Sequence, residues 1–344
     1  MTASPTLKWS VPTKLKPKPK TKPKTPPKSK AKLPPAKLAK TKLSKTKTVK
    51  SKTAPQVLVV EPWKAFPWLL HGFSMRPGGL STGYGAPSLN LGLTQEDKRA
   101  TVERNREIFL AALGATGSGA GSSARRGKTS PLVTLRQIHS DLIHAVSAVP
   151  QEPLVGDGVI TNTPGLVLAV QTADCLPVIV VDPKKKVVGV FHAGWRGTLA
   201  RIVEKGVGEM RRHFDSRPRD LLAAIGPGIH KCCFEVGEEL RPKFEAQFAY
   251  ASELFHKFEE MDPIREKYPM LFLTARAPGH SELPSQLFLD LVEANRKQLL
   301  DAGVAARNIH VSPLCTSCNV DKLFSYRKEK GVTGRMMGAV GIRA

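Results

Sequence analysis

Short hydrophobic runs separated by turn residues dominate the centre of the chain. Leu166–Val170, Pro177–Val181 and Val187–Phe191 are rich in residues that favour strands, and glycine, aspartate, proline or lysine residues flank them. Their hydrophobicity is nearly continuous and does not alternate with polar positions, which is typical of strands buried on both faces. Leu132–Leu135 and Leu221–Ile225 are predicted to be strands as well.

Helical segments and further strands surround this centre. Residues 96–113 and Gln286–Leu300 have helical composition, and Thr198–Phe214 carries an apolar stripe at helical spacing. Val57–Val60 and Ile309–Val311 are predicted to be strands. Because strands and helices mix without strict alternation, the pattern predicts mixed sheets covered by helices and not a doubly wound parallel sheet.

Three segments lack this order. Residues 1–55 contain 17 Lys, no Arg and no acidic residue, and such a segment buries too little apolar surface to fold. We therefore predict a disordered tail over 1–55 and a folded domain over 56–344. Gly114–Ser130, rich in Gly, Ser and Ala, is predicted to be a flexible surface insertion, and glycines in His71–Gly79 indicate a loop.

Charge and cysteine content limit the class of protein. The tail supplies +17 of the net charge of +24, so the high isoelectric point belongs mainly to the tail. Such a tail suits contact with anionic surfaces or nucleic acid, although a solubilising extension without a specific partner is the favoured interpretation. No apolar stretch approaches the roughly 20 residues that span a bilayer. Five cysteines without regular spacing argue against a disulfide framework, so we expect a soluble, cytoplasmic protein.

One cysteine and two histidines lie near the ends of predicted strands. Cys175 precedes Pro177–Val181, and His192 follows the next strand 17 residues later. His139 lies beyond Leu132–Leu135 and adds a second imidazole. One thiolate and two imidazoles fit an open zinc site whose fourth position is left for water or substrate. A buried core cysteine or a catalytic thiol remain alternatives for Cys175.

Other reactive residues carry weaker signals. Cys315 and Cys318 form a Cys-x-x-Cys pair, but Cys232 and Cys233 are adjacent and suit a four-thiolate site poorly, so we predict that all four are turn residues near the active region. Trp195 is placed to stack on a base or to act as a packing lid. Loop arginines suit bidentate binding of phosphate, and four lie in such surroundings: Arg76, Arg196, Arg327 and Arg335.

Several motifs in one order give the chain a resemblance to a known family. They are Gln137–Ser140, Thr172–Pro177, His192–Gly197, the run from Ile225 to Gly237, and Phe324–Arg327 followed by Thr333–Arg335. Each is weak alone, but together they resemble the YfiH/laccase-domain family, formerly described as multicopper polyphenol oxidases and now as purine nucleoside phosphorylases. The resemblance runs from about Trp68 to Gly341 and leaves the lysine-rich tail outside.

The resemblance implies a single catalytic domain of α/β (α+β) class with two stacked mixed β-sheets flanked by helices. It implies a zinc enzyme that phosphorolyses adenosine, inosine, guanosine and methylthioadenosine and also deaminates adenosine. The zinc ligands implied are His139, Cys175 and His192. We expect Cys175 and Asp174 to be catalytic, with Asp174 orienting a ligand or acting as an acid or base. We expect phosphate and nucleoside to bind at Arg76, Trp195 and Arg196.

Three alternatives stay open at this point. A copper-dependent polyphenol oxidase needs further histidine-rich copper centres, and the body has no His-x-His pair, so copper is less favoured than zinc. A metal-free cysteine hydrolase would use Cys175 as the nucleophile with His192 or His139 as the base. A nucleic-acid tether would depend on the tail alone and bind in a salt-sensitive way.

Overall fold

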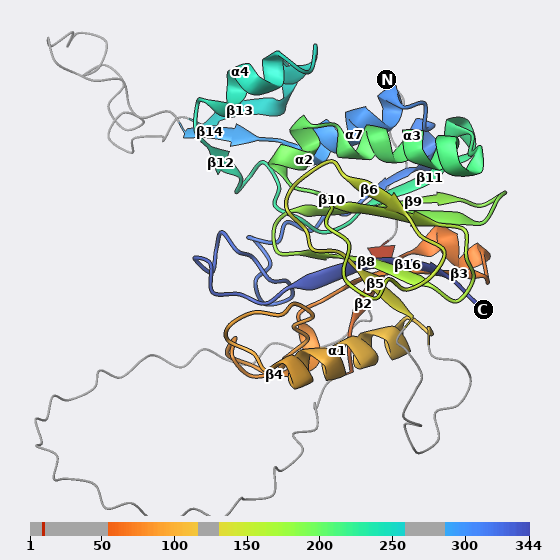
Figure 1. Cartoon of the computed structure of the whole chain (residues 1–344). Coiled ribbons are helices and arrows are strands. Elements are labelled where there is room, and N and C mark those ends of the chain that lie inside the picture. Colours follow the sequence, from red (N-terminus) through yellow and green to blue (C-terminus); the bar gives the residue numbers. More distant parts are fainter. Residues whose placement is uncertain (1–8, 11–53, 116–130, 259–285) are drawn as a thin grey trace, which may run out of the picture.

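Two six-stranded mixed sheets lie face to face at the centre of the molecule, between two helical layers (Figure 1). The structure is a computed structural model, and it describes residues 9–10, 54–115, 131–258 and 286–344. The first sheet has the strand order β1-β2-β3-β16-β8-β5, with the bounds Trp9–Ser10, Val57–Val60, Leu69–Ser74, Met336–Ile342, Val167–Thr172 and Leu132–Thr134. The second sheet has the order β15-β11-β9-β10-β7-β6, with the bounds Ile309–Val311, Leu222–Ile225, Leu176–Asp182, Val187–Ala193, Gly158–Thr161 and Ile143–Ala145.

Helices cover the outer faces of both sheets (Figure 1). Helix α1 (Arg99–Ala112) covers the first sheet, and α2 (Trp195–Leu199), α3 (Ile202–Phe214) and α7 (Leu291–Asp301) cover the second. A small third sheet lies to one side with α4 (Leu240–Glu245), and its strands β12, β14 and β13 span Glu235–Val236, Gln286–Leu289 and Phe255–Phe258. Strand β4 spans Pro77–Ser81. Four 3-10 helices complete the described part of the chain: η1 (Glu61–Ala65), η2 (Pro218–Asp220), η3 (Ala251–Leu254) and η4 (Ala306–Asn308).

The continuous hydrophobicity of the central strands has a direct structural cause. Side chains alternate between the two faces of a strand, and both faces of β9 are covered. Val178 and Val180 pack under the helices of the second sheet, whereas Ile179 and Val181 pack between the two sheets. The strand is buried along its whole length. A strand with two buried faces needs apolar residues at every position, so the predicted fold class of two stacked mixed sheets flanked by helices is confirmed.

Long-range pairing overturns the loop predicted at His71–Gly79. Leu69–Ser74 is the buried strand β3, which pairs with β2 on one side and β16 on the other, and β4 begins at Pro77. A Cβ atom on Gly72 would lie 2.4 Å from Cγ1 of Val57, so this glycine allows close packing within the sheet layer. The glycine content that indicated a loop therefore reflects crowding in a sheet.

Two predicted helices also divide. The segment Thr198–Phe214 is split between α2 and α3 because Arg201 adopts a left-handed backbone with φ of 62°. The segment Gln286–Leu300 begins as strand β14, which ends before Asp290. The Asp290 carboxylate accepts a hydrogen bond from the Glu293 backbone at 2.9 Å, which starts α7 as an N-cap. Composition over a long window therefore missed both boundaries.

Some predictions fall on residues outside the described ranges. They are the flexible insertion, apart from Gly114 and Ala115, and nearly all of the lysine-rich tail. Within the tail, Trp9 and Ser10 form β1, which pairs antiparallel with β2. Among the described residues, no helix is both long enough and apolar enough to cross a membrane.

Candidate functional site

Cys175, His139 and His192 meet where the chain passes from one sheet to the other. Cys175 lies between β8 of the first sheet and β9 of the second, and His192 is near the end of β10. His192 pairs in register with Pro177, so the β9–β10 hairpin carries the histidine back beside the cysteine. The Cys175 Sγ and His139 Nε2 atoms are 3.8 Å apart. The ligand atoms of all three residues lie within 4.8 Å of one another, and the structure thus unites the predicted set.

A buried carboxylate that was not predicted from the sequence organises this set. Asp157 precedes β7, is fully buried, and its Oδ1 lies 2.8 Å from His192 Nδ1. It also accepts hydrogen bonds from the backbone of His139 at 3.0 Å and of Ser140 at 2.6 Å. A bond from Nδ1 to a carboxylate leaves Nε2 of His192 free to act as a ligand. The only local signal for this role was an acidic residue at the start of a glycine-flanked strand.

The electrostatics of the set favour a thiolate. Burial by itself raises the pKa of the Cys175 thiol, but attraction to His192 and hydrogen bonds from both imidazoles outweigh burial and lower the pKa from 9.0 to about 6. Burial opposes a charge on His192, yet the Cys175 thiolate and Asp157 raise its pKa from 6.5 to about 9. Burial likewise opposes a charge on Asp157, but hydrogen bonds from His192 and Ser140 lower its pKa from 3.8 to about 2. The thiolate is thus the stable form at neutral pH.

Backbone geometry directs two of these residues. His139 has φ of 60° and Asp174 has φ of 94°, both in the left-handed region that non-glycine residues seldom adopt. The Asp174 carboxylate accepts hydrogen bonds from Thr316 Oγ1 at 2.6 Å and from the Arg327 backbone at 2.7 Å. Its carbonyl accepts a hydrogen bond from the Ile229 backbone at 2.7 Å. Asp174 therefore connects three loops next to Cys175.

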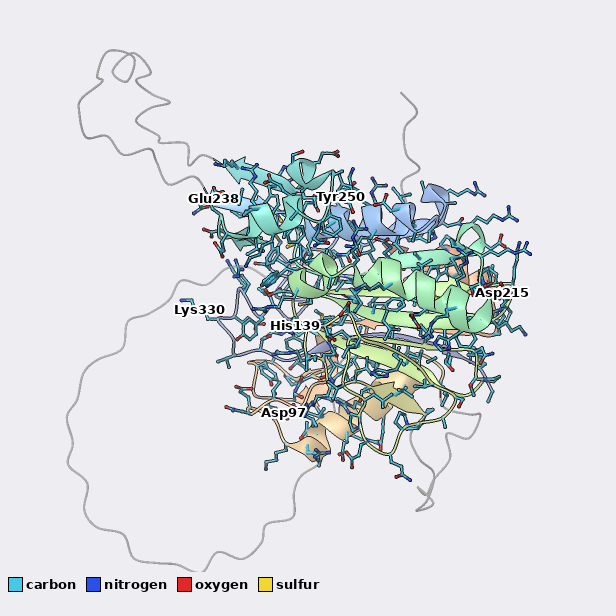
Figure 2. All side chains as sticks on the ribbon, turned by 45° about the horizontal axis from the view of Figure 1, so that its top comes forward. Asp97, His139, Asp215, Glu238, Tyr250 and Lys330 are labelled. Atoms are coloured by element: carbon cyan, nitrogen blue, oxygen red, sulfur yellow. The ribbon has the colours of Figure 1, made fainter. Side chains whose placement is uncertain are left out.

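His139, Cys175 and His192 line a cavity of about 1290 Å³. Figure 2 shows His139 on the same side of the molecule as the loop that carries Lys330, and residues 326, 327 and 335 of that region line the cavity. Among the described residues, the lining is rich in cationic side chains and contains only two carboxylates, Glu152 and Asp174. The arginines of the lining are Arg99, Arg106, Arg136, Arg327 and Arg335. This balance of charge suits an anionic substrate.

The structure separates the other predicted binding residues from this cavity. The Arg76 guanidinium donates to Glu329 at 2.8 Å and to the Tyr84 carbonyl at 2.7 Å, and the side chain is not part of the cavity lining. Trp195 and Arg196 line a separate, smaller pocket of about 490 Å³. The Arg196 guanidinium lies 4.4 Å from the centroid of the Trp195 ring. Helix α2 begins at Trp195, and neither of its first two side chains lines the cavity that contains His192.

Two of the four arginines noted in the sequence do reach the cavity. Arg335 donates to the carbonyls of Thr333 and Gly334 at 3.0 and 3.1 Å, which holds its guanidinium in place. Arg327 donates to the Glu235 carbonyl at 2.9 Å. The sequence-based choice of Arg76 and Arg196 did not select these two arginines, because the distances from Cys175 depend on how the C-terminal loop folds back onto the β8–β9 connection.

The fold and the site together define an α+β protein with a candidate metal centre in an arginine-lined cavity. The chain belongs to the family described as multi-copper polyphenol oxidoreductase laccase, whose model matches residues 70–343. It is 34% identical over 288 residues to the purine nucleoside phosphorylase YlmD of Geobacillus stearothermophilus, covering 79% of this chain and 89% of that protein. It is 35% identical over 273 residues to the purine nucleoside phosphorylase of Deinococcus radiodurans, covering 79% and 88%.

A solved structure has the same fold. The crystal structure of the hypothetical protein YfiH of Bacillus licheniformis superposes with a TM-score of 0.67 at 30% identity, and the match covers 85% of this chain and 98% of that one. The resemblance to the YfiH/laccase-domain family drawn from the motifs is therefore confirmed.

Proposed function

We propose that this protein is a purine nucleoside phosphorylase. It would cleave adenosine, inosine, guanosine or methylthioadenosine with phosphate, giving the free base and the ribose 1-phosphate derivative. The observation that carries the proposal is the union of an open Cys/His/His set and several arginines in one cavity, in a chain 34–35% identical to proteins named purine nucleoside phosphorylases.

The donor set fits zinc. Zinc accepts thiolate and imidazole ligands, and three protein ligands leave the fourth position open, as in catalytic sites. The Asp157 carboxylate behind His192 supplies the outer hydrogen bond that usually accompanies a histidine ligand. When bound, the ion supplies Lewis acidity at this end of the cavity, which phosphorolysis and the deamination of adenosine can both use. Copper can bind the same three residues, so the metal content of the purified protein must be measured to distinguish zinc from copper.

The phosphate site in this proposal uses arginines that line the cavity. In phosphorolysis, a phosphate oxygen attacks C1′ of the ribose while the bond from C1′ to the purine nitrogen breaks. Arg327 and Arg335 hold the dianion next to the sugar, and Arg136, which also lines the cavity, is a third candidate. Guanidinium groups that are fixed in the cavity wall position the phosphate nucleophile and neutralise its charge. Positioning and charge stabilisation of this kind account for much of the rate of such reactions. These arginines replace Arg76 and Arg196 in the role expected from the sequence.

The purine and Asp174 have separate places in the proposal. Tyr326 is 55% exposed and lines the cavity together with Phe234, so both rings offer a face for stacking on a purine. The Asp174 carboxylate already accepts two hydrogen bonds from protein groups. We therefore assign Asp174 the role of positioning the cavity wall and Cys175 the role of metal ligand, and no proton transfer is assigned to Asp174.

Product analysis tests the proposal. Purified protein of known metal content is incubated with adenosine, with and without phosphate, and the products are separated by chromatography. Adenine and ribose 1-phosphate that form only with phosphate support the proposal, whereas inosine alone means that deamination is the main activity. Arg335→Ala should raise the KM for phosphate, and Arg196→Ala, outside the cavity, is the matched control. No phosphate-dependent product with any of the four nucleosides contradicts the proposal.

The same purified protein can be tested for two other functions, phenol oxidation and metal-free cysteine hydrolysis. Phenol oxidation through several copper centres has weaker support, because the described residues hold just two groups of metal-ligating side chains, and only one contains histidine. A metal-free cysteine hydrolase has one favourable observation, the Cys175 thiolate beside His192. Activity that persists after complete zinc removal would favour that hydrolase.

A further inference from the structure

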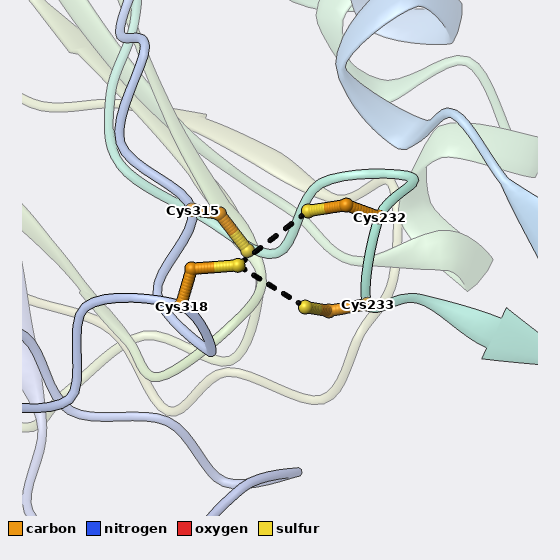
Figure 3. A group of neighbouring side chains, drawn as sticks. All are labelled: Cys232, Cys233, Cys315 and Cys318. Carbon is orange, nitrogen blue, oxygen red and sulfur yellow. Dashed lines mark hydrogen bonds between the residues drawn. The ribbon is translucent and has the colours of Figure 1, made fainter.

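Four cysteines outside the candidate active site converge on one point. Cys232 and Cys233 lie in the loop after β11, and Cys315 and Cys318 lie in the loop after β15. The strands β11 and β15 are parallel neighbours, so both loops leave the second sheet at the same edge. Figure 3 shows the four side chains pointing toward one another from the two loops. The four cysteines lie in turns, as the sequence predicted, but the expectation that the adjacent Cys232 and Cys233 suit a four-thiolate site poorly is wrong.

Backbone contacts hold the two loops together independently of the thiols. Gly228 and Cys315 form a parallel bridge, and the Thr316 backbone donates to the Gly228 carbonyl at 2.9 Å. A tight turn follows, in which the backbones of Cys233 and Phe234 both donate to the His230 carbonyl at 2.9 Å. This turn lets two adjacent cysteines face the same point, which the sequence spacing alone did not suggest.

The distances between the sulfur atoms match a single tetrahedral ion. Sγ of Cys318 lies 3.4 Å from that of Cys233 and 3.7 Å from that of Cys232. All four sulfur atoms lie within 4.8 Å of one another. A Zn–S bond of about 2.3 Å places the corners of a tetrahedron about 3.8 Å apart. A disulfide would need about 2.05 Å. An iron–sulfur cluster spreads its cysteines over several irons and so favours wider spacing.

The backbone around the thiols also suits thiolate ligands. The His230 backbone N–H donates to Sγ of Cys315 at 3.5 Å, and Cys315 is buried. Such a bond stabilises a sulfur that carries negative charge. Cys232 and Cys318 are exposed, which gives an ion a path of entry from solvent.

We propose that Cys232, Cys233, Cys315 and Cys318 bind a second, structural zinc ion. The ion replaces the four thiol protons, which pass to solvent, and no electron transfer is involved. Four protein ligands leave no open position, so this centre takes no part in the chemistry at Cys175. With this assignment all five cysteines of the chain have a role in metal binding.

The proposed centre would brace the wall of the active-site cavity. Its two loops carry Thr316 and Ile229, which both hydrogen-bond to Asp174, the residue before Cys175. The loop after β11 also supplies Ile229 and Phe234 to the cavity lining. A cross-link between the loops would fix Asp174 in its left-handed conformation. The proposal does not depend on which nucleoside the enzyme accepts, or on whether it is a phosphorylase.

Metal counting and X-ray absorption on full-length variants test the proposal. Cys175→Ser disables the candidate active site and should retain one zinc per chain, with four sulfur neighbours at about 2.3 Å and no nitrogen neighbour. Cys318→Ser should retain one zinc with mixed nitrogen and sulfur neighbours, and the double variant should retain none. Each single variant is thus the matched control for the other.

Several outcomes would overturn the proposal. Cys175→Ser protein without zinc, or with zinc that has nitrogen neighbours, excludes a four-sulfur centre. Thiol titration of the denatured, metal-free wild-type chain should find five free thiols, and a disulfide would lower this number to three. If a disulfide is found and Cys175→Ser protein also holds no zinc, these cysteines form a redox pair and not a zinc centre. If Cys318→Ser does not fold, the measurement on Cys175→Ser still decides, because it leaves all four cysteines unchanged.

Discussion

Replacing Asp157 by asparagine, a side chain of the same shape, should weaken metal binding at Cys175, His139 and His192. One carboxylate oxygen faces His192 Nδ1 and the His139 backbone. The other accepts from the Ile138 backbone and from the Ser140 backbone and hydroxyl. Both carboxylate oxygens accept hydrogen bonds, but an amide has one oxygen and one NH2 group. In Asp157→Asn the NH2 group must therefore face hydrogen-bond donors, either at His192 or at Ser140. If the NH2 group faces His192, Nδ1 must accept and Nε2 carries the proton, so the imidazole loses its ligand atom. If it faces Ser140, the backbone N–H groups of Ile138 and Ser140 and the Ser140 hydroxyl lose their acceptor.

The size of the effect follows from this geometry. Loss of an outer hydrogen bond to a histidine ligand typically lowers metal affinity about 10–100-fold, and we expect at least this for Asp157→Asn. Asp157 is fully buried, so the free energy of unfolding of the metal-free protein should fall by about 3 kcal/mol, where the ranges for a charged hydrogen bond and a broken buried pair meet.

Chelator competition for zinc and urea unfolding measure the two quantities. Asp141→Asn is the matched control, because this carboxylate lies two residues beyond His139 and pairs with Lys205 at the surface. The control should change the free energy of unfolding by at most about 0.5 kcal/mol. If Asp157→Asn binds zinc as tightly as Asp141→Asn does, the assigned role of Asp157 is wrong.

Three further changes test other parts of the fold. Burial lowers the pKa of His71 from 6.5 to about 4, so its stabilising contribution is complete above pH 6.5 and is lost as the pH falls to 4, by up to about 3 kcal/mol; His71→Gln should flatten the profile of unfolding free energy over this range. A Cβ atom on Gly194 would lie 2.9 Å from Cys175 Sγ, so Gly194→Ala should lower zinc affinity at least about tenfold. Phe191→Ala removes a fully buried ring and should cost about 3–5 kcal/mol in urea unfolding.

Each of these changes has a control in the same chain. His213→Gln removes an exposed histidine on α3 and should leave the acid limb of the stability profile intact. Gly208→Ala adds a methyl group where no atom outside its own helix backbone and chain neighbours lies within 4 Å, so it should bind zinc like the wild type. Leu93→Ala truncates a side chain that is 50% exposed and should cost far less than Phe191→Ala. Equal effects in a variant and its control would contradict the structural reason given.

The candidate site depends both on the β9–β10 hairpin and on the β8–β9 connection between the two sheets. Cys175 is held by the short connection between β8 and β9, which belong to different sheets. His192 returns to it because β9 and β10 pair antiparallel, and His139 arrives from the end of β5 beside β8. Damage to either sheet therefore moves one ligand relative to the others, so stability and metal binding should decline together in core variants.

Local sequence determined the central strands and the pairing of Cys175 with His192 in the candidate metal site. Strands such as Pro177–Val181 are buried on both faces, so their hydrophobicity is visible without knowledge of their partners. Cys175 and His192 flank one hairpin, and their separation of 17 positions is just enough for a strand, a turn and a returning strand. Short-range patterns carry such information because both the pairing and the burial arise within a few residues.

Only the tertiary structure decided which distant side chains meet. Asp157 lies 35 residues from His192, and Cys233 lies 85 residues from Cys318, so no local pattern records either contact. The same holds for the arginines: Arg335 lines the cavity whereas Arg76 pairs with Glu329, because the C-terminal loop folds back over the β8–β9 connection. Periodicity reports which residues are buried, but strand order and loop packing set their partners, and these depend on contacts across the whole chain.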